Sequence, residues 1–346
     1  MSTNVSRRSF LASTAAALAA SAWPRPGRAA PPPKLIWGNL LHLSYNMWSD
    51  RPVEAWGALK GEELGHVCRQ PYLRFDEKLW RDLLQAMSRG GLNLVVIDLG
   101  DAVAYRSHPE IAVQNAWSPR KLREELARCR DLGLEPIPKL NFSTAHDAWL
   151  GKYSRMVSTP DYYRVCRELI AEVAELFDAP RFFHIGYDEE TAAHQAQYEY
   201  VVVRQYELWW HDFEFFAQTV AEQKTRPWIW SDYAWKHTDA FFARMPKNVA
   251  QSNWYYGLSF NPEKDTAAKT YVELERHGYD QIPTASNWSV PENFRRTVEF
   301  ARQHIAPERL LGFLQTPWKP TRESCRAHHE AAIRLVAETI AGQPPA

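Results

Sequence analysis

Short apolar runs alternate with longer amphipathic stretches along most of this 346-residue chain. The clearest apolar run, Leu92 to Asp98, has the length and branched residues of a buried strand, and it ends in an acid. Helix-start signals lie between the runs, as where Ser118 precedes Pro119 and Thr159 precedes Pro160. The pattern therefore predicts strands and helices in strict alternation.

The apolar runs predict eight strands. They cover Leu35 to Met47, Leu92 to Asp98, Leu134 to Leu140, Arg181 to Asp188, Pro227 to Asp232, Val249 to Trp254, Gln281 to Ser286 and Leu310 to Gln315. The amphipathic stretches predict helices from the cap Asp76 to Met87, from Pro119 to Leu132, from Pro160 to Phe177, from about Tyr200 to Lys224, from Asp239 to Arg244, from Lys264 to His277, from Pro291 onward and from Thr321 to Ile340.

Strands that alternate with helices pair in parallel through right-handed crossovers, and eight such units close a barrel. A doubly wound open sheet is the alternative architecture, but the glycine-rich phosphate turn that it often carries is absent. We expect an α/β protein with one (β/α)8 TIM barrel domain over residues 31–346.

The first 30 residues have the features of an export signal. Ser6 to Leu11 contains an Arg-Arg pair in a twin-arginine context, and an apolar stretch to Ala22 follows that is too short to span a bilayer. We expect residues 1–30 to be a twin-arginine signal peptide and the folded protein to be periplasmic or secreted in a bacterium.

Charge and composition narrow the partners. The 41 basic and 41 acidic residues give no net charge, which disfavours nucleic acid and, after signal removal, an anionic membrane. The 15 Trp residues exceed what a core needs, and flat indole faces suit sugar rings, although most such rings fill helix–sheet interfaces. A carbohydrate partner is expected.

Metal and cofactor sites are not indicated. The four cysteines lack Cys-x-x-Cys spacing, and Cys129 and Cys166 lie in helical patterns typical of buried thiols. The pair His328-His329 lacks ligand spacing, and no loop suits a nucleotide. We expect neither a metal nor a cofactor.

Acids gather at the predicted strand ends: Asp98, Asp101, Asp188, Glu189, Glu190 and Asp232. In the run that starts at Arg181, His184, Gly186 and Asp188 share the face toward the barrel interior, and Glu189 follows at the rim. Paired carboxylates are what glycosidic cleavage needs, because one donates a proton and the other stabilises positive charge. The alternative is an acidic helix start, which we expect for Glu190.

The segment His184 to Glu189 resembles the His-x-Gly-Gly-Asp-Glu signature of the family 20 glycoside hydrolases, the β-N-acetylhexosaminidases. Weaker resemblances follow in the same order, at Gly133 to Trp149, Glu172 to Phe177, Trp230 to Asp232 and Leu311 to Trp318. The resemblance implies substrate-assisted, retaining cleavage of terminal N-acetylhexosamine, in which the substrate's acetamido oxygen is the nucleophile.

The resemblance also implies roles for individual residues. Asp188 would orient the acetamido group, and Glu189 would be the general acid and then the base. The expected substrate-binding residues are His184 and His146, which would support the acids, together with Trp230, Asp232, Trp254, Tyr255, Trp318 and Asp98. Tyr256 and then Tyr233 are the further candidates for the tyrosine that binds the acetamido oxygen.

The chain departs from the family pattern at several positions. Tyr187 replaces the second glycine of the signature, no arginine follows the first strand until Arg51, and Lys319 replaces the acid after Trp318, with Glu323 further on. Two alternatives therefore stay open. One is a glycosidase for another sugar with Asp232 or Asp98 as nucleophile, and the other is a catalytically silent carbohydrate-binding barrel.

Overall fold

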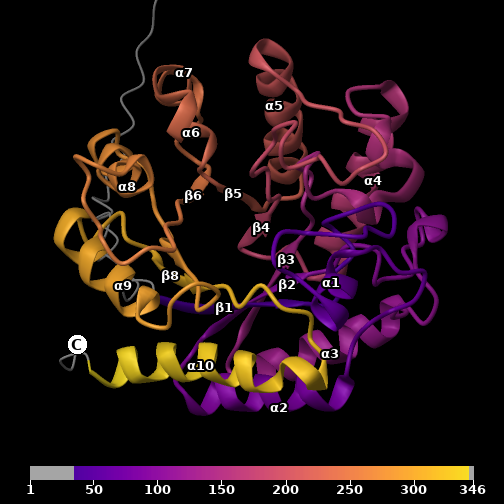
Figure 1. Ribbon diagram of the computed structural model, residues 1–346, viewed down its shortest axis with the longest axis horizontal. Coiled ribbons are helices and arrows are strands. Elements are labelled where there is room, and N and C mark those ends of the chain that lie inside the picture. Colours follow the sequence, from indigo (N-terminus) through magenta and orange to yellow (C-terminus); the bar gives the residue numbers. More distant parts are fainter. Residues whose placement is uncertain (1–34, 343–346) are drawn as a thin grey trace, which may run out of the picture. The chain divides into compact units, whose positions relative to one another are not determined.

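The computed structural model describes residues 35–342, and in this part of the chain eight strands form one parallel sheet in the order β6-β5-β4-β3-β2-β1-β8-β7 (Figure 1). The predicted signal peptide lies outside the described residues. The strands are β1 (Ile36–His42), β2 (Leu94–Asp98), β3 (Glu135–Lys139), β4 (Phe182–His184), β5 (Arg226–Trp230), β6 (Ala250–Ser252), β7 (Thr284–Ala285) and β8 (Gly312–Gln315).

The two edges of the sheet meet at β6 and β7. Isolated parallel bridges join Gln251 to Gln281 and Trp254 to Thr284, and the Ile282 amide donates to the carbonyl of Gln251 at 2.8 Å. The sheet therefore curls into a nearly closed barrel, and the predicted single-domain (β/α)8 fold is confirmed.

Helices follow the strands and pack around the sheet. They are α1 (Gly61–Val67), α2 (Glu77–Arg89), α3 (Pro119–Asp131), α4 (Pro160–Leu176), α5 (Tyr206–Glu222), α6 (Tyr233–Lys236), α7 (Thr238–Arg244), α8 (Thr266–Arg276), α9 (Asn293–His304) and α10 (Arg326–Ala341), with short 3₁₀ segments η1 (Pro109–Ile111), η2 (Ala148–Arg155) and η3 (Glu323–Cys325). The last helix, α10, lies beside α2 (Figure 1).

The predicted caps account for two helix starts. The Ser118 hydroxyl accepts the amide of Lys121, and the Thr159 hydroxyl accepts the amide of Tyr162. Asp76 makes no such bond with its own helix, and its carboxylate accepts the amide of Glu323 instead. Asp76 therefore joins the start of α2 to η3.

Two apolar layers surround the strands. Leu40, Val96, Ile137, Phe182 and Trp228 belong to a cluster inside the barrel. Alternate strand residues such as Phe183 and Ile229 belong to the larger cluster between the sheet and the helices. Inward and outward positions therefore alternate as the sequence predicted.

Several element bounds differ from the prediction. The strand expected to reach Asp188 ends at His184, α5 begins at Tyr206 rather than near Tyr200, and the helix α1 was not expected. All four cysteines are buried free thiols. Within residues 35–342, every helix is too short or too polar to cross a bilayer.

Candidate active site

Three acid/base side chains meet at the carboxyl edge of the barrel. Asp188 and Glu189 follow β4, and His146 comes from the connection between β3 and α4. The Nε2 atom of His146 lies 3.5 Å from Oδ2 of Asp188 and 3.3 Å from Oε2 of Glu189. One imidazole therefore contacts both candidate catalytic carboxylates.

The backbone after β4 turns sharply to present these acids. Gly186, Tyr187 and Glu189 have φ angles of 68°, 77° and 54°, in the left-handed region. For a residue with a side chain this conformation costs about 1–3 kcal/mol. The ring of Tyr187 is buried between Arg204, at 4.6 Å, and Trp209, at 5.0 Å, and this packing offsets the cost at Tyr187.

Asn141, just beyond β3, holds this turn in place. Its amide nitrogen donates to Oδ1 of Asp188 at 2.9 Å, and its oxygen accepts the backbone amides of Tyr187 at 3.2 Å and Ser143 at 3.0 Å. A Cβ atom at Gly186 would lie 2.0 Å from the oxygen of Asn141. Glycine is therefore required at position 186 for close approach as well as for its positive φ.

Asp232, just beyond β5, is a third carboxyl group at the site. Its Oδ2 accepts the backbone amide of Glu189 at 2.9 Å, whereas its Oδ1 is buried without a hydrogen-bond partner. Burial, together with the charges of Asp188 and Glu189, raises the pKa of Asp232 to about 8. Asp232 is therefore mainly protonated at neutral pH.

Glu189 lies between two histidines. Its Oε2 faces His146, and its Oε1 lies 3.5 Å from Nε2 of His194. Burial raises the pKa of Glu189, but the bond and charge of His146 and the charge of His194 outweigh it, so the pKa is below its usual value. Burial lowers the pKa of His146, but Asp188 and Glu189 outweigh burial and raise it above its usual value. In the free protein, the proton that His146 and Glu189 can share therefore resides on His146.

Aromatic rings form the wall beside the acids. The indole nitrogen of Trp318 donates to the hydroxyl of Tyr256 at 2.9 Å, and Tyr256 stacks on Trp254 with 5.0 Å between ring centroids. Trp230 lies 6.0 Å from Trp318 and is buried, with its indole nitrogen unpartnered. Indole and phenol faces of this kind suit sugar rings.

Trp48, after β1, extends this wall toward His146. Its ring meets His146 edge to face at 4.9 Å and Trp318 at 6.2 Å. Nearby, the hydroxyl of Tyr45 donates to the carbonyl of Trp318 at 2.8 Å. The segment after the first strand, where family 20 enzymes would have an arginine, therefore supplies aromatic rings to the site.

Three charged residues named above among the departures from the family pattern make their contacts away from the acids. Arg51 is exposed and contacts the carbonyl of Pro52, Lys319 binds Glu63 at 2.6 Å, and Glu323 binds Arg326 at 2.6 Å. None of these contacts includes Asp188 or Glu189.

Asp98 and His184 lie deeper, inside the barrel. Asp98 pairs with the buried Lys139 at 2.5 Å and lies 3.4 Å from Nδ1 of His42. His184 accepts the amide of Gly186 at 3.0 Å and packs on Trp230 at 4.2 Å. His184 thus supports the acids, as expected, but through the turn that carries them and not through a hydrogen bond to either carboxylate.

Two cavities border Glu189. The smaller, of about 240 Å³, is lined by Trp48, Trp56, His146 and His194 among others. The larger, of about 400 Å³, extends past Asp232 toward α6 and the start of α5. Glu189 therefore lies on the wall between two openings.

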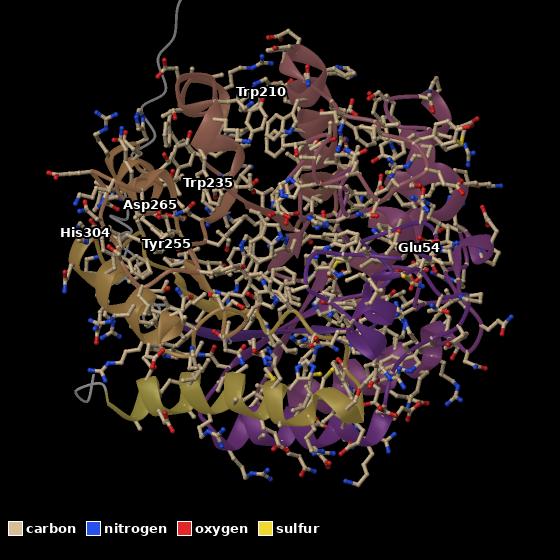
Figure 2. The ribbon with its side chains drawn as sticks, in the orientation of Figure 1. Glu54, Trp210, Trp235, Tyr255, Asp265 and His304 are labelled. Atoms are coloured by element: carbon tan, nitrogen blue, oxygen red, sulfur yellow. The ribbon has the colours of Figure 1, made fainter. Side chains whose placement is uncertain are left out.

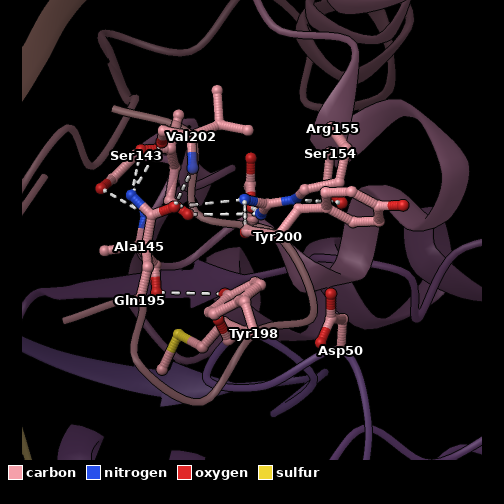
Figure 3. Close-up of polar contacts among 12 residues, drawn as sticks. Asp50, Ser143, Ala145, Ser154, Arg155, Gln195, Tyr198, Tyr200 and Val202 are labelled. Atoms are coloured by element: carbon pink, nitrogen blue, oxygen red, sulfur yellow. Dashed lines mark hydrogen bonds and ion pairs between the residues drawn. The ribbon is translucent and has the colours of Figure 1, made fainter. Parts of the chain in front are cut away.

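The long connection between β4 and α5 is anchored to the barrel rim (Figure 3). Gln195 donates to Thr144 and to the carbonyl of Val202, each at 2.8 Å, and the Tyr198 hydroxyl donates to the carbonyl of Met47 at 2.6 Å. Glu190, expected to begin a helix, instead forms a buried pair with Arg204 at 2.7 Å. These contacts fix the loop that carries Glu189 and His194.

The structure brings together most of the residues that the sequence suggested. Asp188, Glu189, His146 and Asp232 share contacts, and Trp230, Trp254 and Trp318 line the wall beside them. Tyr255 lies away from the acids, on the side of α8 and α9 near Asp265, where its hydroxyl donates to the carbonyl of Ser259 (Figure 2). Tyr256, the second tyrosine candidate, occupies the wall instead.

Sequence reasoning missed Asn141, Trp48 and His194. Asn141 directly follows the apolar run that ends at Leu140. It therefore lies at a predicted strand end, which is the same signal that identified the acids. The ligand atoms of His146, Asp188 and Glu189 lie within 4.8 Å of one another, which is also close enough for a metal ion. The expectation that the site binds no metal remains a prediction.

Solved structures show which known fold the barrel shares. No protein-family model and no curated protein matches the sequence. The chain is similar to N-acetyl-β-hexosaminidase from Streptomyces plicatus in complex with thio-NAglucal, with a TM-score of 0.60 and 14% identity over 91% of this chain and 65% of that one.

Two further structures agree. The exo-β-N-acetylglucosaminidase from Vibrio harveyi in complex with N-acetylglucosamine has a TM-score of 0.57 and 13% identity over 87% of this chain and 54% of that one. The β-N-acetylhexosaminidase from Bacteroides fragilis has a TM-score of 0.56 and 14% identity over 87% of this chain and 66% of that one. The chain thus spans between half and two thirds of each of these structures, and it has the barrel fold of the family 20 β-N-acetylhexosaminidases.

Proposed function

We propose that this protein is a glycoside hydrolase that removes terminal N-acetylhexosamine through substrate assistance. The observation that carries the proposal is the contact of one imidazole, His146, with both Asp188 and Glu189 beside a wall of Trp and Tyr rings. The shared barrel fold supports it by analogy. The substrate is a carbohydrate with an N-acetylated amino sugar at its non-reducing end.

Asp188 orients the acetamido group in this mechanism. Asn141 fixes one carboxylate oxygen and His146 faces the other, so the carboxylate has a defined direction. A fixed negative charge stabilises the positive oxazolinium ion that forms as the acetamido oxygen attacks the anomeric carbon. The protein then needs no nucleophile of its own.

Glu189 transfers the proton. In the free protein the proton is on His146, because the two histidines hold the pKa of Glu189 below its usual value. A bound sugar excludes water from Glu189, which raises the pKa of this carboxyl and favours transfer of the proton from His146. Glu189 then protonates the leaving oxygen and, as a carboxylate, activates the water that opens the oxazolinium ion.

The alternative with a protein nucleophile has less support. Asp98 is paired with Lys139 inside the barrel, and burial raises the pKa of Asp232 to about 8, so Asp232 is not an ionised nucleophile at neutral pH. The other alternative, a barrel that binds carbohydrate without cleaving it, is one of the possible results of the hydrolysis experiment below.

Hydrolysis of an aryl N-acetyl-β-glucosaminide tests the proposal. We expect the wild type to cleave it and a thiazoline mimic of the oxazoline to inhibit. Glu189→Gln should abolish cleavage, whereas Glu199→Gln, an exposed change on the same loop, should leave it intact. Cleavage of unsubstituted glycosides without thiazoline inhibition would reject the mechanism, and sugar binding without any cleavage would support the silent barrel.

We also propose that the protein is exported, on the strength of the twin-arginine pattern at Ser6 to Leu11. Replacement of Arg7 and Arg8 by Lys should retain the protein in the cytoplasm, which fractionation of an expressing bacterium would detect. Export of the Lys-Lys variant at the wild-type level would contradict this.

A further inference from the structure

Arg155, at the end of η2, uses its whole guanidinium group to join two loops of the barrel rim (Figure 3). A guanidinium carries five N–H donors in a planar fork, and five acceptors surround this one. The acceptors are Oγ of Ser154 at 3.2 Å from Nε, Oε1 of Gln195 at 3.3 Å and the carbonyl of Tyr200 at 3.2 Å from Nη1, and the carbonyl of Thr144 at 3.3 Å and Oδ1 of Asp147 from Nη2. The guanidinium also lies 4.5 Å from the centre of the Tyr198 ring. A lysine, with three donors on one atom, could not make this set of bonds.

Two of these acceptors lie beside the histidines that contact Glu189. Asp147 directly follows His146 on the connection after β3, and Gln195 directly follows His194 on the connection after β4. His146 contacts Oε2 of Glu189 at 3.3 Å, and His194 contacts Oε1 at 3.5 Å. The guanidinium therefore ties together the two loop segments that hold this carboxylate from both sides.

The carboxyl of Asp147 depends on Arg155. It is fully buried, its Oδ2 has no hydrogen-bond partner, and Arg155 is the one partner of its Oδ1 within residues 35–342. The side chain of Gln195 also donates to the hydroxyl of Thr144 at 2.8 Å, so the two loops keep one direct link without Arg155. Loss of Arg155 would thus leave a buried carboxyl unpaired one residue from His146, which makes this stretch the one that shifts.

Arg155 itself does not reach the reacting groups. None of its five hydrogen bonds goes to Asp188 or Glu189, and it does not line either of the two cavities beside Glu189. Its side chain is 16% exposed, so its place is open to solvent on one side. Any effect on the reaction must pass through the residues that it holds.

We propose that Arg155 is a positioning residue, which holds His146 and His194 against the two oxygens of Glu189. His146 then stays within reach of both carboxylates whenever a proton passes to or from Glu189. This inference rests on the proposed function, because it needs Glu189 as the acid and base of the reaction.

The pKa of His146 reports its position. Asp188 and Glu189 face this imidazole and raise its pKa, Lys139 lowers it, and the ring of Trp48 beside it carries no charge. Movement of His146 away from the two carboxylates would lower its pKa. Removal of a nearby cation without any movement would instead raise the pKa, because a positive charge disfavours the imidazolium. The direction of the change therefore separates positioning from a simple charge effect.

Asp147 keeps the same charge in this comparison. Burial raises the pKa of this carboxyl to about 8 in spite of Arg155 and Arg204, and the loss of Arg155 would raise it further. Asp147 is therefore mainly protonated at neutral pH with or without Arg155. A fall in the pKa of His146 would then come from movement.

The first test is the activity of the full-length protein on the aryl N-acetyl-β-glucosaminide. Arg155→Ala should lower kcat by about 10- to 100-fold with a smaller change in KM, since displacement of a catalytic group by about 1 Å can cost the larger factor. Millimolar methylguanidinium should restore part of the lost rate, whereas Arg155→Lys, which keeps the charge without the planar fork, should stay below the wild type. Lys152→Ala is the matched control with unchanged kcat, because Lys152 is an exposed cation of the same 3₁₀ segment.

The second test is an NMR titration of the His146 imidazole in protein with labelled histidine, with His146→Gln to assign the signal. We expect the pKa of His146 to be lower in Arg155→Ala and Arg155→Lys than in the wild type, and unchanged in Lys152→Ala. An unchanged or raised pKa in folded Arg155→Ala would overturn the inference, and wild-type kcat in this variant would do the same; both leave the proposed function standing.

The two proposals fail separately. A loss of kcat without a fall in the pKa of His146 and without methylguanidinium rescue would show that Arg155 supports only the stability of the fold. If Arg155→Ala does not fold, the same comparison with Arg155→Lys decides. If the wild type cleaves nothing, the proposed function fails, while the titration still shows whether Arg155 holds His146 in place.

Discussion

The side-chain amide of Asn141 donates to Oδ1 of Asp188 at 2.9 Å, while its oxygen occupies the space directly beside Gly186. One side chain from the end of β3 thus sets both the direction of the first acid and the path of the turn after β4. The precision of the site depends on this contact between neighbouring strands.

Asn141→Ala should lower kcat on the aryl N-acetylglucosaminide by about 100-fold, with a smaller change in KM, because displacement of a catalytic group by about 1 Å can cost that factor. Gly186→Ala should have a similar effect, since its Cβ would displace Asn141. Steady-state kinetics measure both, and thermal unfolding checks that the variants are folded. Wild-type kcat in either folded variant would show that Asn141 does not position Asp188.

His146→Gln should move the alkaline limb of the pH dependence of kcat/KM to lower pH. The wild type keeps its shared proton up to the pKa of His146, which Asp188 and Glu189 raise above its usual value. In the variant only the carboxyl of Glu189 can hold this proton. Although the loss of His146 raises the pKa of Glu189, a carboxyl starts from a usual value of about 4.3, against about 6.5 for an imidazole. A pH–rate profile from pH 4 to 9 measures this. A limb that stays in place would remove His146 from the proton pathway.

Asp232→Asn should remove a loss of stability that occurs as pH rises from about 4 to about 8. Burial raises the pKa of Asp232 to about 8, so between about pH 4, where the unfolded carboxyl ionises, and pH 8 the folded state holds a proton that the unfolded state has lost. The contribution of Asp232 to the free energy of unfolding therefore falls as pH rises from about 4 to about 8. Asn can still accept the Glu189 amide. Urea unfolding at pH 5 and pH 8 should show a smaller pH difference in the variant, and an equal difference would contradict the raised pKa.

Lys139→Met should destabilise the fold by about 3–5 kcal/mol, because it leaves the buried Asp98 without its partner. Burial alone would raise the pKa of Asp98, but Lys139 and His42 lower it to about 2. Asp98 therefore contributes stability above about pH 4 that is lost as pH falls toward 2. The double variant Lys139→Met, Asp98→Leu is the control and should recover most of the loss. Urea unfolding of both variants tests this, and equal stabilities would show that the pair itself is not the cause.

A strand such as β2 could be predicted because it is a nearly continuous apolar run, which is how a strand buried on both faces is encoded. The strands β6 and β7, which contain Gln251, Ser252 and Thr284, were predicted from their positions between helical patterns rather than from an apolar run. The predicted ends of strands were less accurate where the backbone leaves the sheet at a position that no polar residue marks. β4 stops at His184 because Gly186 and Tyr187 adopt left-handed angles, and nothing in an apolar Ile-Gly-Tyr segment predicts such angles at Tyr187.

The acids and His146 could be placed from strand ends and from the family resemblance, because both give chain positions. Contacts between loops could not be predicted from the sequence. Whether Tyr255 or Tyr256 faces the acids depends on how the backbone turns after β6, where the two-residue alternation of a strand no longer applies. Asn141 acts across two strands whose register only the fold provides.

The bridges between β6 and β7 are fewer than the pairings of β1 with β2, and this difference has a dynamic consequence. Amide hydrogens along this junction should exchange with solvent sooner than those of β1 and β2, because local opening there breaks fewer bonds. Tyr256 and Trp254 follow β6, so the aromatic wall stands at a part of the barrel that opens more easily than the pairing of β1 with β2. Local opening of this junction would move the aromatic wall away from Asp188. The turn that carries Asp188 would stay in place, because Asn141 holds it from the end of β3.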